Sequence, residues 1–325
     1  MKKRLIKHSL TAFICLIMML ALTLPAFADD TLPWSGKGTA ADPYKIGTAA
    51  DLKAVSEQVA KGNDFSGVYF KVTNEINLAT VCSAESSWVP IGTSATPFAG
   101  NFDGNNNNVR GLTVKNQTYN ALFGKTQGAV IKNVNVYGTS ESAGVYAAGV
   151  AAYAENTTLE KVVSYTAVSS KGNVSCFGGG VVAHAVDSEI KDCENGGLVS
   201  GTPTDEAVEC KAGGIVGYAL NSSLQNCKNT NIVNYVGNSQ SYVGGIIGNA
   251  EGSNIQSCQN SKEVIVSGSC SVQYGGIAGN ISISQEKTNV VLKDCVNSGE
   301  VKTSSVVSMA YGGGITGYAS GVILQ

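Results

Sequence analysis

Few side chains in this sequence can serve as an acid, a base or a nucleophile. The chain has two histidines, and His8 lies in an apolar leader, which leaves His184. A Ser-His-Asp or Cys-His hydrolase would depend on this single imidazole. In other copies of the repeat described below, the same position holds Tyr153, Tyr218, Asn249, Asn280 or Tyr318. We therefore interpret His184 as a variable polar position, name no catalytic residue, and exclude a histidine-rich metal site.

Carboxylates are the second kind of candidate, because glycoside hydrolysis needs two of them facing one bond. Asp192 and Asp294 occupy matching positions in two copies of the repeat, but Asn226 and Ser257 replace them in the copies between. This pattern favours exposed turn or strand residues over a catalytic pair. The sequence also lacks the Gly-x-x-x-x-Gly-Lys-Ser/Thr phosphate loop. We expect no bound cofactor.

Eight of the nine cysteines lie beyond the leader. Four of these stand where earlier copies of the repeat hold valine, as a small buried apolar side chain would: Cys193, Cys227, Cys258 and Cys295. The sequence favours an internal row of free thiols over disulfides at these positions. Cys176, Cys210 and Cys270 each precede a Gly-Gly pair, so we expect them to lie near one another. No Cys-x-x-Cys pair occurs, and we predict no zinc site.

These residues are carried by an internal repeat that covers most of the chain. Seven residues after the small residue that closes each Gly-Gly-x-x-Gly-like run comes an aliphatic side chain. The seven aliphatic residues are Ile131, Leu159, Ile190, Leu224, Ile255, Leu292 and Leu324. In the copy that begins at Gly279, six extra residues precede Leu292, as expected for a loop on one face. Five residues after the aliphatic position, four copies carry an asparagine. This row suits turns, where asparagine tolerates left-handed backbone angles and stacks with itself.

The repeat favours short strands, since its apolar runs are brief and are bounded by glycine, asparagine and serine. One unit of about 31 residues cannot bury its apolar face alone, but units stacked at a strand spacing of about 4.8 Å can. We predict an all-β fold, a right-handed parallel β-helix. A β-propeller, with blades of about 40 residues, is the structural alternative.

The same residues resemble a known family. Gly214-Ile215-Val216-Gly217 and its copies at 245–248, 276–279 and 314–317 look like the GLUG motif of bacterial surface and secreted proteins. The lead-in around 98–104 is similar to the start of that repeat array. The resemblance covers about residues 34–325 and implies an extracellular β-helix, often one module of a larger protein. The motifs are short and glycine-rich, so they indicate architecture more than activity.

Residues 1–28 read as a signal peptide. A basic start is followed by an apolar stretch, Leu10 to Leu24, and by the cleavage pattern Ala26-Phe27-Ala28. No other run reaches the roughly 18 apolar residues of a membrane span. We predict a secreted or cell-surface protein, cleaved near Ala28.

Residues 29–66 are predicted to form an N-terminal cap. Thr48 begins a capping-box pattern, Leu52, Val55 and Val59 recur at helical spacing, and Lys61-Gly62 ends the run. We expect a helix at 48–61 that covers the first open coil. A small separate domain is the alternative.

The predicted β-helix domain occupies residues 67–325, and we expect it to continue beyond Gln325 or to be truncated there. Within it, Asp103-Gly-Asn-Asn-Asn-Asn108 reads as a turn. A calcium loop is the alternative for this run, but it lacks the spaced carboxylates and terminal glutamate of an EF-hand.

Two classes of function remain open. After cleavage, the chain has 18 basic and 24 acidic residues, a net charge of −6, which argues against nucleic acid. We favour a non-enzymatic extracellular binding or stalk module, adhesin-like, monomeric or part of a multidomain chain, with glycans or host proteins as partners. The alternative is a carbohydrate-active β-helix enzyme, a polysaccharide lyase or a glycosidase, which would need a cluster of acids in a cleft.

Overall fold

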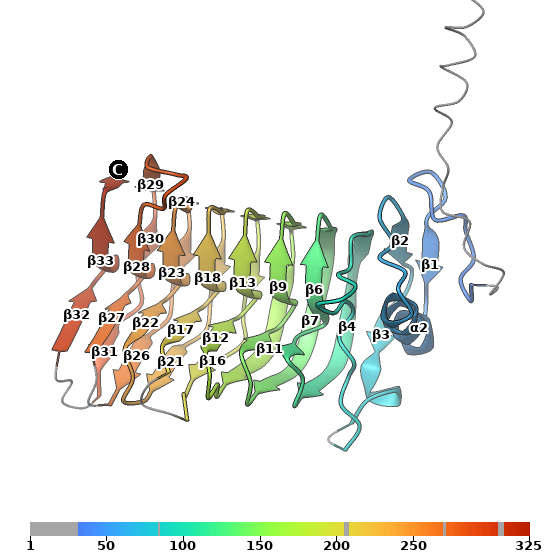
Figure 1. Ribbon diagram of the computed structural model, residues 1–325, viewed down its shortest axis with the longest axis horizontal. Coiled ribbons are helices and arrows are strands. Elements are labelled where there is room, and N and C mark those ends of the chain that lie inside the picture. The colour runs from blue at the N-terminus through green and yellow to red at the C-terminus, as the bar shows by residue number, and fades with distance from the viewer. Residues whose placement is uncertain (1–31, 84, 205–207, 269–270, 305–308) are drawn as a thin grey trace, which may run out of the picture. The chain divides into compact units, whose positions relative to one another are not determined.

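The computed structural model describes residues 32–83, 85–204, 208–268, 271–304 and 309–325. The predicted signal peptide and Cys270 lie outside these ranges. Residues 34–325 form one compact unit. Within it, successive coils stack side by side and pair through parallel strands (Figure 1). The predicted parallel β-helix is confirmed.

Three parallel sheets run along the stack. Sheet C contains β5 (Tyr119–Asn120), β8 (Tyr146–Ala148), β12 (Cys176–Gly179), β17 (Cys210–Gly213), β22 (Ser241–Gly244), β27 (Ser271–Gly275) and β32 (Met309–Gly313). Sheet B contains β6 (Phe123–Gln127), β9 (Ala151–Glu155), β13 (Val182–Val186), β18 (Val216–Leu220), β23 (Ile247–Glu251), β28 (Ala278–Ser282) and β33 (Thr316–Ser320).

Sheet A forms the remaining wall and has 20 strands. Its early members are β1 (Tyr44–Ile46), β2 (Tyr69–Val72), β3 (Ile76–Asn77), β4 (Asn101–Lys115), β7 (Val130–Ser142), β10 (Thr158–Glu160), β11 (Val163–Ser170), β14 (Glu189–Lys191), β15 (Glu194–Asn195) and β16 (Val199–Gly201). The later members are β19 (Ser223–Gln225), β20 (Lys228–Asn229), β21 (Val233–Val236), β24 (Asn254–Gln256), β25 (Gln259–Asn260), β26 (Val264–Ser267), β29 (Val290–Lys293), β30 (Val296–Asn297), β31 (Val301–Thr303) and β34 (Val322–Leu324).

The predicted aliphatic row is confirmed along sheet A. Ile131, Leu159 and Ile190 are direct partners in the parallel register, and the row continues to Leu324. Stacking identical positions in this way buries the aliphatic side chain of every coil from Ile131 to Leu292, while Leu324 stays exposed in the last described coil. The extra residues before Leu292 lie between β28 and β29. There, Ser284 donates a hydrogen bond to Oδ1 of Asn221, at 2.7 Å, across two coils.

One left-handed turn of each coil lies two residues after the aliphatic position, and in most coils a second lies three residues before it, as at Asn156 and Asn221. Six coils hold the first of these residues at a φ between 52° and 54°: Asn133, Lys161, Asp192, Asn226, Ser257 and Asp294. Asp192 and Asp294 are exposed, and Asn226 donates a hydrogen bond to Asp192 at 3.1 Å. These two acids are therefore turn residues, as predicted.

The asparagine row stacks with itself, as predicted, but it does not form the left-handed turns that we expected. Asn195, Asn229, Asn260 and Asn297 do not have the left-handed backbone that suits turns. Instead their side chains point into the stack, and the Nδ2 of Asn195, Asn229 and Asn260 donates to the Oδ1 of the asparagine in the next coil at 2.8 Å. Each Nδ2 also donates to the carbonyl two residues later. The amides therefore replace backbone pairing where each coil bends, because buried polar groups need partners.

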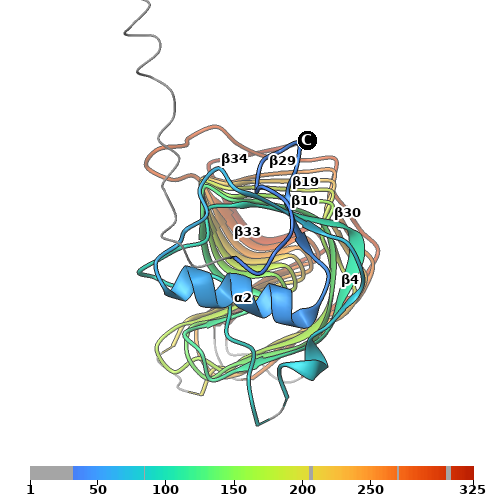
Figure 2. The same cartoon turned by 90° about the vertical axis from the view of Figure 1, so that its right-hand side faces the viewer.

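The predicted capping helix is confirmed as α2 (Ala49–Ala60). Thr48 Oγ1 accepts from the Asp51 amide at 3.1 Å, and Asp51 Oδ2 accepts from the Thr48 amide at 2.9 Å. Leu52, Val55 and Val59 are fully buried. Figure 2 shows α2 lying across the end of the coil stack. In the described part of the chain, no helix is long and apolar enough to cross a membrane.

The parallel ladder begins ahead of the predicted boundary at residue 67, because β1 pairs with β2 in parallel register. Residues 103–108, interpreted as a plain turn, lie within β4, where a left-handed bulge shifts the register with β7 between Asp103 and Asn107. The Asp103 carboxylate accepts from the Asn105 amide at 2.8 Å. Asn105 and Asn106 adopt left-handed φ values of 51° and 60°. The remaining short helix, η1 (Leu78–Thr80), follows β3.

The cysteine row is also confirmed. Cys193, Cys227 and Cys258 are buried free thiols, and Cys295 is half-buried. Each sulfur donates to the carbonyl two residues earlier. Cys176 and Cys210 are partners in sheet C, and a disulfide joins them with their Cα atoms 4.4 Å apart.

Candidate functional site

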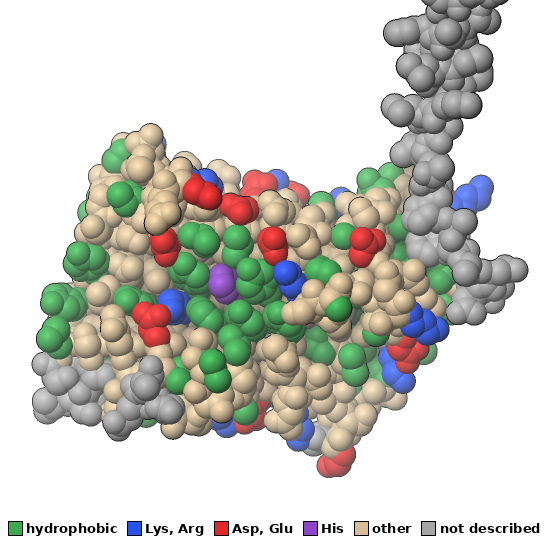
Figure 3. Space-filling view, in the orientation of Figure 1, with side chains coloured by type: hydrophobic (Ala, Val, Ile, Leu, Met, Phe, Trp, Pro, Cys, Tyr) green, Lys and Arg blue, Asp and Glu red, His purple; other side chains and the backbone are tan. Residues whose placement is uncertain are grey.

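Aromatic side chains gather where the outer faces of sheets C and B meet. We call this set the aromatic patch. It comprises Tyr119, Tyr146 and Phe177 from sheet C, with Tyr153, His184 and Tyr218 from sheet B. All six are half-buried. Figure 3 shows the imidazole of His184 among hydrophobic side chains, bordered by lysines and carboxylates.

The fold places these rings by register. Outward positions of adjacent coils are direct partners, so Tyr146 lies beside Phe177 and His184 lies between Tyr153 and Tyr218. Within a coil the two rows are seven residues apart, as in Tyr146 and Tyr153 or Phe177 and His184. The bend between the sheets brings these outward side chains together, with centroids 5.7 Å apart in the first pair and 5.2 Å in the second.

The sheet C rings form a stack along the axis. Tyr119 and Tyr146 are 5.3 Å apart with planes inclined by 4°, and Tyr146 and Phe177 are 5.3 Å apart at 18°. Because the ring faces contact one another, edges and hydroxyl groups are left for solvent. In sheet B, His184 lies 4.7 Å from both Tyr153 and Tyr218, with tilted planes.

Two paired lysines border the rings. Lys125 Nζ lies 3.1 Å from Glu155 and 5.0 Å from the centre of the Tyr153 ring. Lys211 is 9% exposed, pairs with Glu209, and lies 5.0 Å from the Phe177 ring and 5.4 Å from the Tyr218 ring. Cations above aromatic faces are favourable, most of all where water is excluded. The lysines therefore hold the rings in place while carboxylates offset their charge.

The hydroxyl groups of Tyr146, Tyr153 and Tyr218 stay protonated, because the pKa of each is raised. Burial raises the pKa of Tyr146 to about 12, and burial followed by the Glu155 charge raises the pKa of Tyr153. The Tyr218 hydroxyl donates to Glu251 at 2.8 Å. Within the described residues, no hydrogen bond is formed by the hydroxyls of Tyr146 or Tyr153. These two groups are therefore donors that an incoming ligand can use.

The imidazole of His184 is neutral at physiological pH. Burial, followed by the nearby Lys211 charge, lowers the pKa of His184 to about 4. Its Nδ1 atom has no hydrogen-bond partner among the described residues. Tyr153, His184 and Tyr218 are direct partners in the ladder, so the imidazole stands where neighbouring coils hold a tyrosine.

Acid should destabilise the protein through His184. A group whose folded pKa is about 4 takes up its proton in the unfolded chain first, near pH 6.5. The free energy of unfolding should therefore fall between pH 6.5 and pH 4, by about 3 kcal/mol in total. Urea unfolding of the wild type and of His184→Tyr, compared from pH 7 to pH 4, checks this. The unfolding free energy of His184→Tyr should rise relative to that of the wild type as the pH falls. Parallel pH profiles would contradict it.

Tyr318, which the sequence placed in the same row as His184, lies outside the aromatic patch. Tyr318 lies on the same ladder but is separated from Tyr218 by Asn249 and Asn280, and it packs on Tyr311 instead. Among the described residues, no group of three or more His, Cys, Asp or Glu side chains could hold a metal ion. We did not predict the sheet C row. The repeated seven-residue offset from the His184 position was the available signal.

Comparisons with known proteins agree with the repeat and the fold. The family model "The GLUG motif" matches residues 210–234, which confirms the predicted motif. A protein of Evansella cellulosilytica named "Putative Gly-rich membrane protein" is 31% identical over 136 residues. That match covers 40% of this chain and 15% of the relative, so the chain corresponds to a small part of the relative's length.

A solved structure shares the architecture. A chain from Bacteroides ovatus, described as "a putative immunoglobulin A1 protease", superposes with a TM-score of 0.63 at 18% identity. The superposition covers 90% of this chain and 86% of that one. At this identity, the likeness concerns the fold.

Proposed function

We propose that this protein is a non-enzymatic extracellular binding module that holds a linear polysaccharide along its aromatic patch. The observation that carries the proposal is the patch itself, where each of two adjoining faces presents three half-buried rings on consecutive coils. Aromatic side chains combined with a few convergent polar groups are typical of ligand sites.

The chemistry of the patch suits a chain of hydroxyl groups. The hydroxyls of Tyr146 and Tyr153 are protonated donors that lack partners in the described structure. Glu251 and Glu155 add acceptors at the border. The ring edges offer apolar contact between these polar groups. Sugars present the same alternation of hydroxyl groups and C–H surface.

The extent of the patch favours a polymer over a compact molecule. Its rings span the four coils from Tyr119 to Tyr218, a length of about 15 Å at the usual strand spacing. Because equivalent side chains recur along a straight axis, a ligand with its own linear repeat can contact each coil in turn. Several such contacts add avidity without a deep pocket.

An extracellular location remains part of the proposal. It rests on the basic, apolar and Ala-x-Ala pattern of residues 1–28 and on the GLUG motif at 210–234. The adhesin-like role rests on the same two features. The alternative function is a carbohydrate-active enzyme. An assay for released product distinguishes this alternative from a binding module.

Removing two hydroxyl groups should weaken binding at least tenfold. Tyr146→Phe combined with Tyr153→Phe keeps the stacked rings, since phenylalanine already occupies the equivalent position at Phe177. A tenfold change corresponds to about 1.4 kcal/mol, the order of one or two lost hydrogen bonds. Affinity electrophoresis against a panel of plant, host and microbial polysaccharides measures the effect.

Tyr318→Phe is the matched control, because it removes a tyrosine hydroxyl from the same ladder outside the patch. It should bind like the wild type. If the double variant also binds like the wild type, the polysaccharide lies elsewhere and the patch serves only to stabilise the fold.

A further inference from the structure

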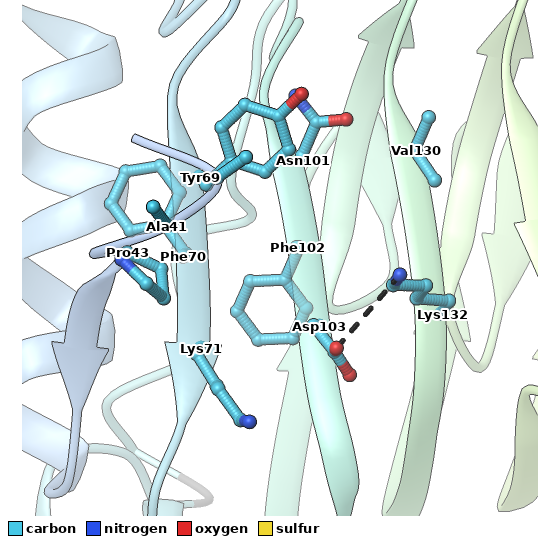
Figure 4. A pocket seen from close by; sticks show the side chains of 11 residues that line it. Ala41, Pro43, Tyr69, Phe70, Lys71, Asn101, Phe102, Asp103, Val130 and Lys132 are labelled. Carbon is cyan, nitrogen blue, oxygen red and sulfur yellow. Dashed lines mark ion pairs between the residues drawn. The ribbon is translucent and has the colours of Figure 1, made fainter. Parts of the chain in front are cut away.

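A second candidate site lies on the outer face of sheet A, in the first coils. A pocket of about 400 Å³ is bordered by the segment Ala40–Pro43 on one side and by β2, β4 and β7 on the other. Figure 4 shows Tyr69 and Asn101 at one end of the pocket, and Lys71, Asp103 and Lys132 at the other. This volume lies within the range of small-ligand sites in proteins.

Register explains the charged end. Lys71, Asp103 and Lys132 are consecutive partners in the parallel ladder, so their side chains leave the same face of neighbouring strands. The Asp103 carboxylate faces Lys132 at 3.9 Å, and it also accepts from the Asn105 amide and from the Asn133 side chain. Among the described residues, Lys71 has no ion pair or hydrogen bond through its ammonium group.

The pocket therefore has an excess of positive charge in a chain that is acidic overall. The pocket holds two ammonium groups and one carboxylate, and that carboxylate is already satisfied by Lys132, the Asn105 amide and the Asn133 side chain. Lys45, the ladder neighbour of Lys71 in the coil before, adds a further cation along the row. An anion in the pocket would supply the missing partner of Lys71 through charge-assisted hydrogen bonds.

The other end of the pocket has a different character. The Tyr69 ring is 37% exposed, and Ala41, Pro43 and Val130 add apolar wall. Asn101 contributes an amide that makes one long contact, 3.4 Å, to the Val68 carbonyl. A ligand that fits needs a carboxylate at one end, an apolar ring face at the other, and hydroxyl groups between them.

We propose that this pocket binds a carboxylated sugar, a uronic acid residue, with its carboxylate between Lys71 and Lys132 and its ring against Tyr69. The site is separate from the aromatic patch, and it stands whether or not that patch binds a polysaccharide.

The test compares two ligands that differ only in the carboxylate. Methyl glucuronide and methyl glucoside are titrated into the purified protein from residue 29 to its end, followed by NMR chemical shifts. We expect the glucuronide to bind at least tenfold more tightly than the glucoside. Added salt should lower the affinity for the glucuronide, because the lysines are partly exposed and salt screens their charge. Equal binding of the two ligands, or binding of neither, would overturn the proposal.

Variants assign the site. Lys71→Glu should lower the affinity for the glucuronide at least tenfold. Lys191→Ala should leave it unchanged, since Lys191 lies on the same row two coils beyond Lys132 and pairs with Glu160 and Glu189. The Tyr146→Phe and Tyr153→Phe variant should also leave it unchanged.

A third ligand separates a sugar site from a general anion site. Inorganic phosphate should compete weakly, because it lacks the ring that contacts Tyr69. Tyr69→Ala should lower the affinity for methyl glucuronide and leave the affinity for phosphate unchanged. Phosphate that binds as tightly as the glucuronide, or a Lys71→Glu variant that binds normally, would overturn the proposal.

Discussion

Replacing Gly214 with alanine should lower the free energy of unfolding by about 3 kcal/mol or more. Gly214 lies at the bend between β17 and β18, where an added Cβ would stand 2.1 Å from the Gly245 carbonyl oxygen of the next coil. It would also stand 2.5 Å from the Asn229 side chain. Both neighbours are held by the stack, so neither can yield without opening the space between coils.

The matched control is Gly314→Ala. Gly314 occupies the same position of the repeat in the last described coil, where an added Cβ meets nothing within 4 Å. This substitution should change the unfolding free energy by less than about 0.5 kcal/mol. Urea denaturation followed by circular dichroism compares the two. Equal effects would mean that the spacing between coils does not exclude a side chain at Gly214.

Replacing Asn229 with alanine should lower the free energy of unfolding by about 4 kcal/mol. Asn229 is fully buried and accepts from Asn195 Nδ2 at 2.8 Å. Its own Nδ2 donates to Asn260 and to the Asn231 carbonyl. The substitution leaves several buried polar groups without partners, and each such group costs about 1–3 kcal/mol.

The control for this prediction is Asn234→Ala. Asn234 is half-buried on β21, and its side chain forms no hydrogen bond within the described structure. The urea midpoint of the Asn234→Ala variant should equal that of the wild type. Asn297→Ala should be intermediate, because Asn297 lies at the end of the row and receives its ladder bond from Asn260 alone among the described coils. A midpoint for Asn229→Ala equal to that of Asn234→Ala would show that the amide row adds no stability.

The repeat predicted the architecture because each coil obeys the same spatial constraint. An aliphatic side chain seven residues after the residue that closes each glycine run must fill the core at the same height of each coil, so Leu224 and Ile255 align in sequence and in space. The helix at the start was equally predictable, since the Thr48 capping pattern and the spacing of Leu52 and Val55 are local signals.

The role of the asparagine row was not predictable from composition. Asparagine is common both in left-handed turns and in hydrogen-bonded ladders, and its spacing in sequence does not distinguish them. The turn position falls instead three residues earlier, as at Asn226 before Asn229. Only the path of the backbone shows which residue bends the chain and which points inward.

The candidate sites were harder to predict for the same reason. His184 and Tyr153 stood out because they replace one another in the repeat. Their neighbours Tyr146 and Phe177 belong to another sheet, and the angle of the bend decides whether the two rows meet. The pocket beside Lys71 needs the fold of the Ala40–Pro43 segment, which lies before the repeat.

The most direct test of the proposed function is to pass a polysaccharide panel over the immobilised protein, residue 29 onward, with calcium present. The same mixtures are assayed for reducing ends and for unsaturated products. We expect at least one polysaccharide to be retained with no product released, and retention to be lost when Tyr146 and Tyr153 are both replaced by phenylalanine. Release of product would contradict a binding module and would favour a carbohydrate-active enzyme. Absence of both retention and release would contradict polysaccharide binding.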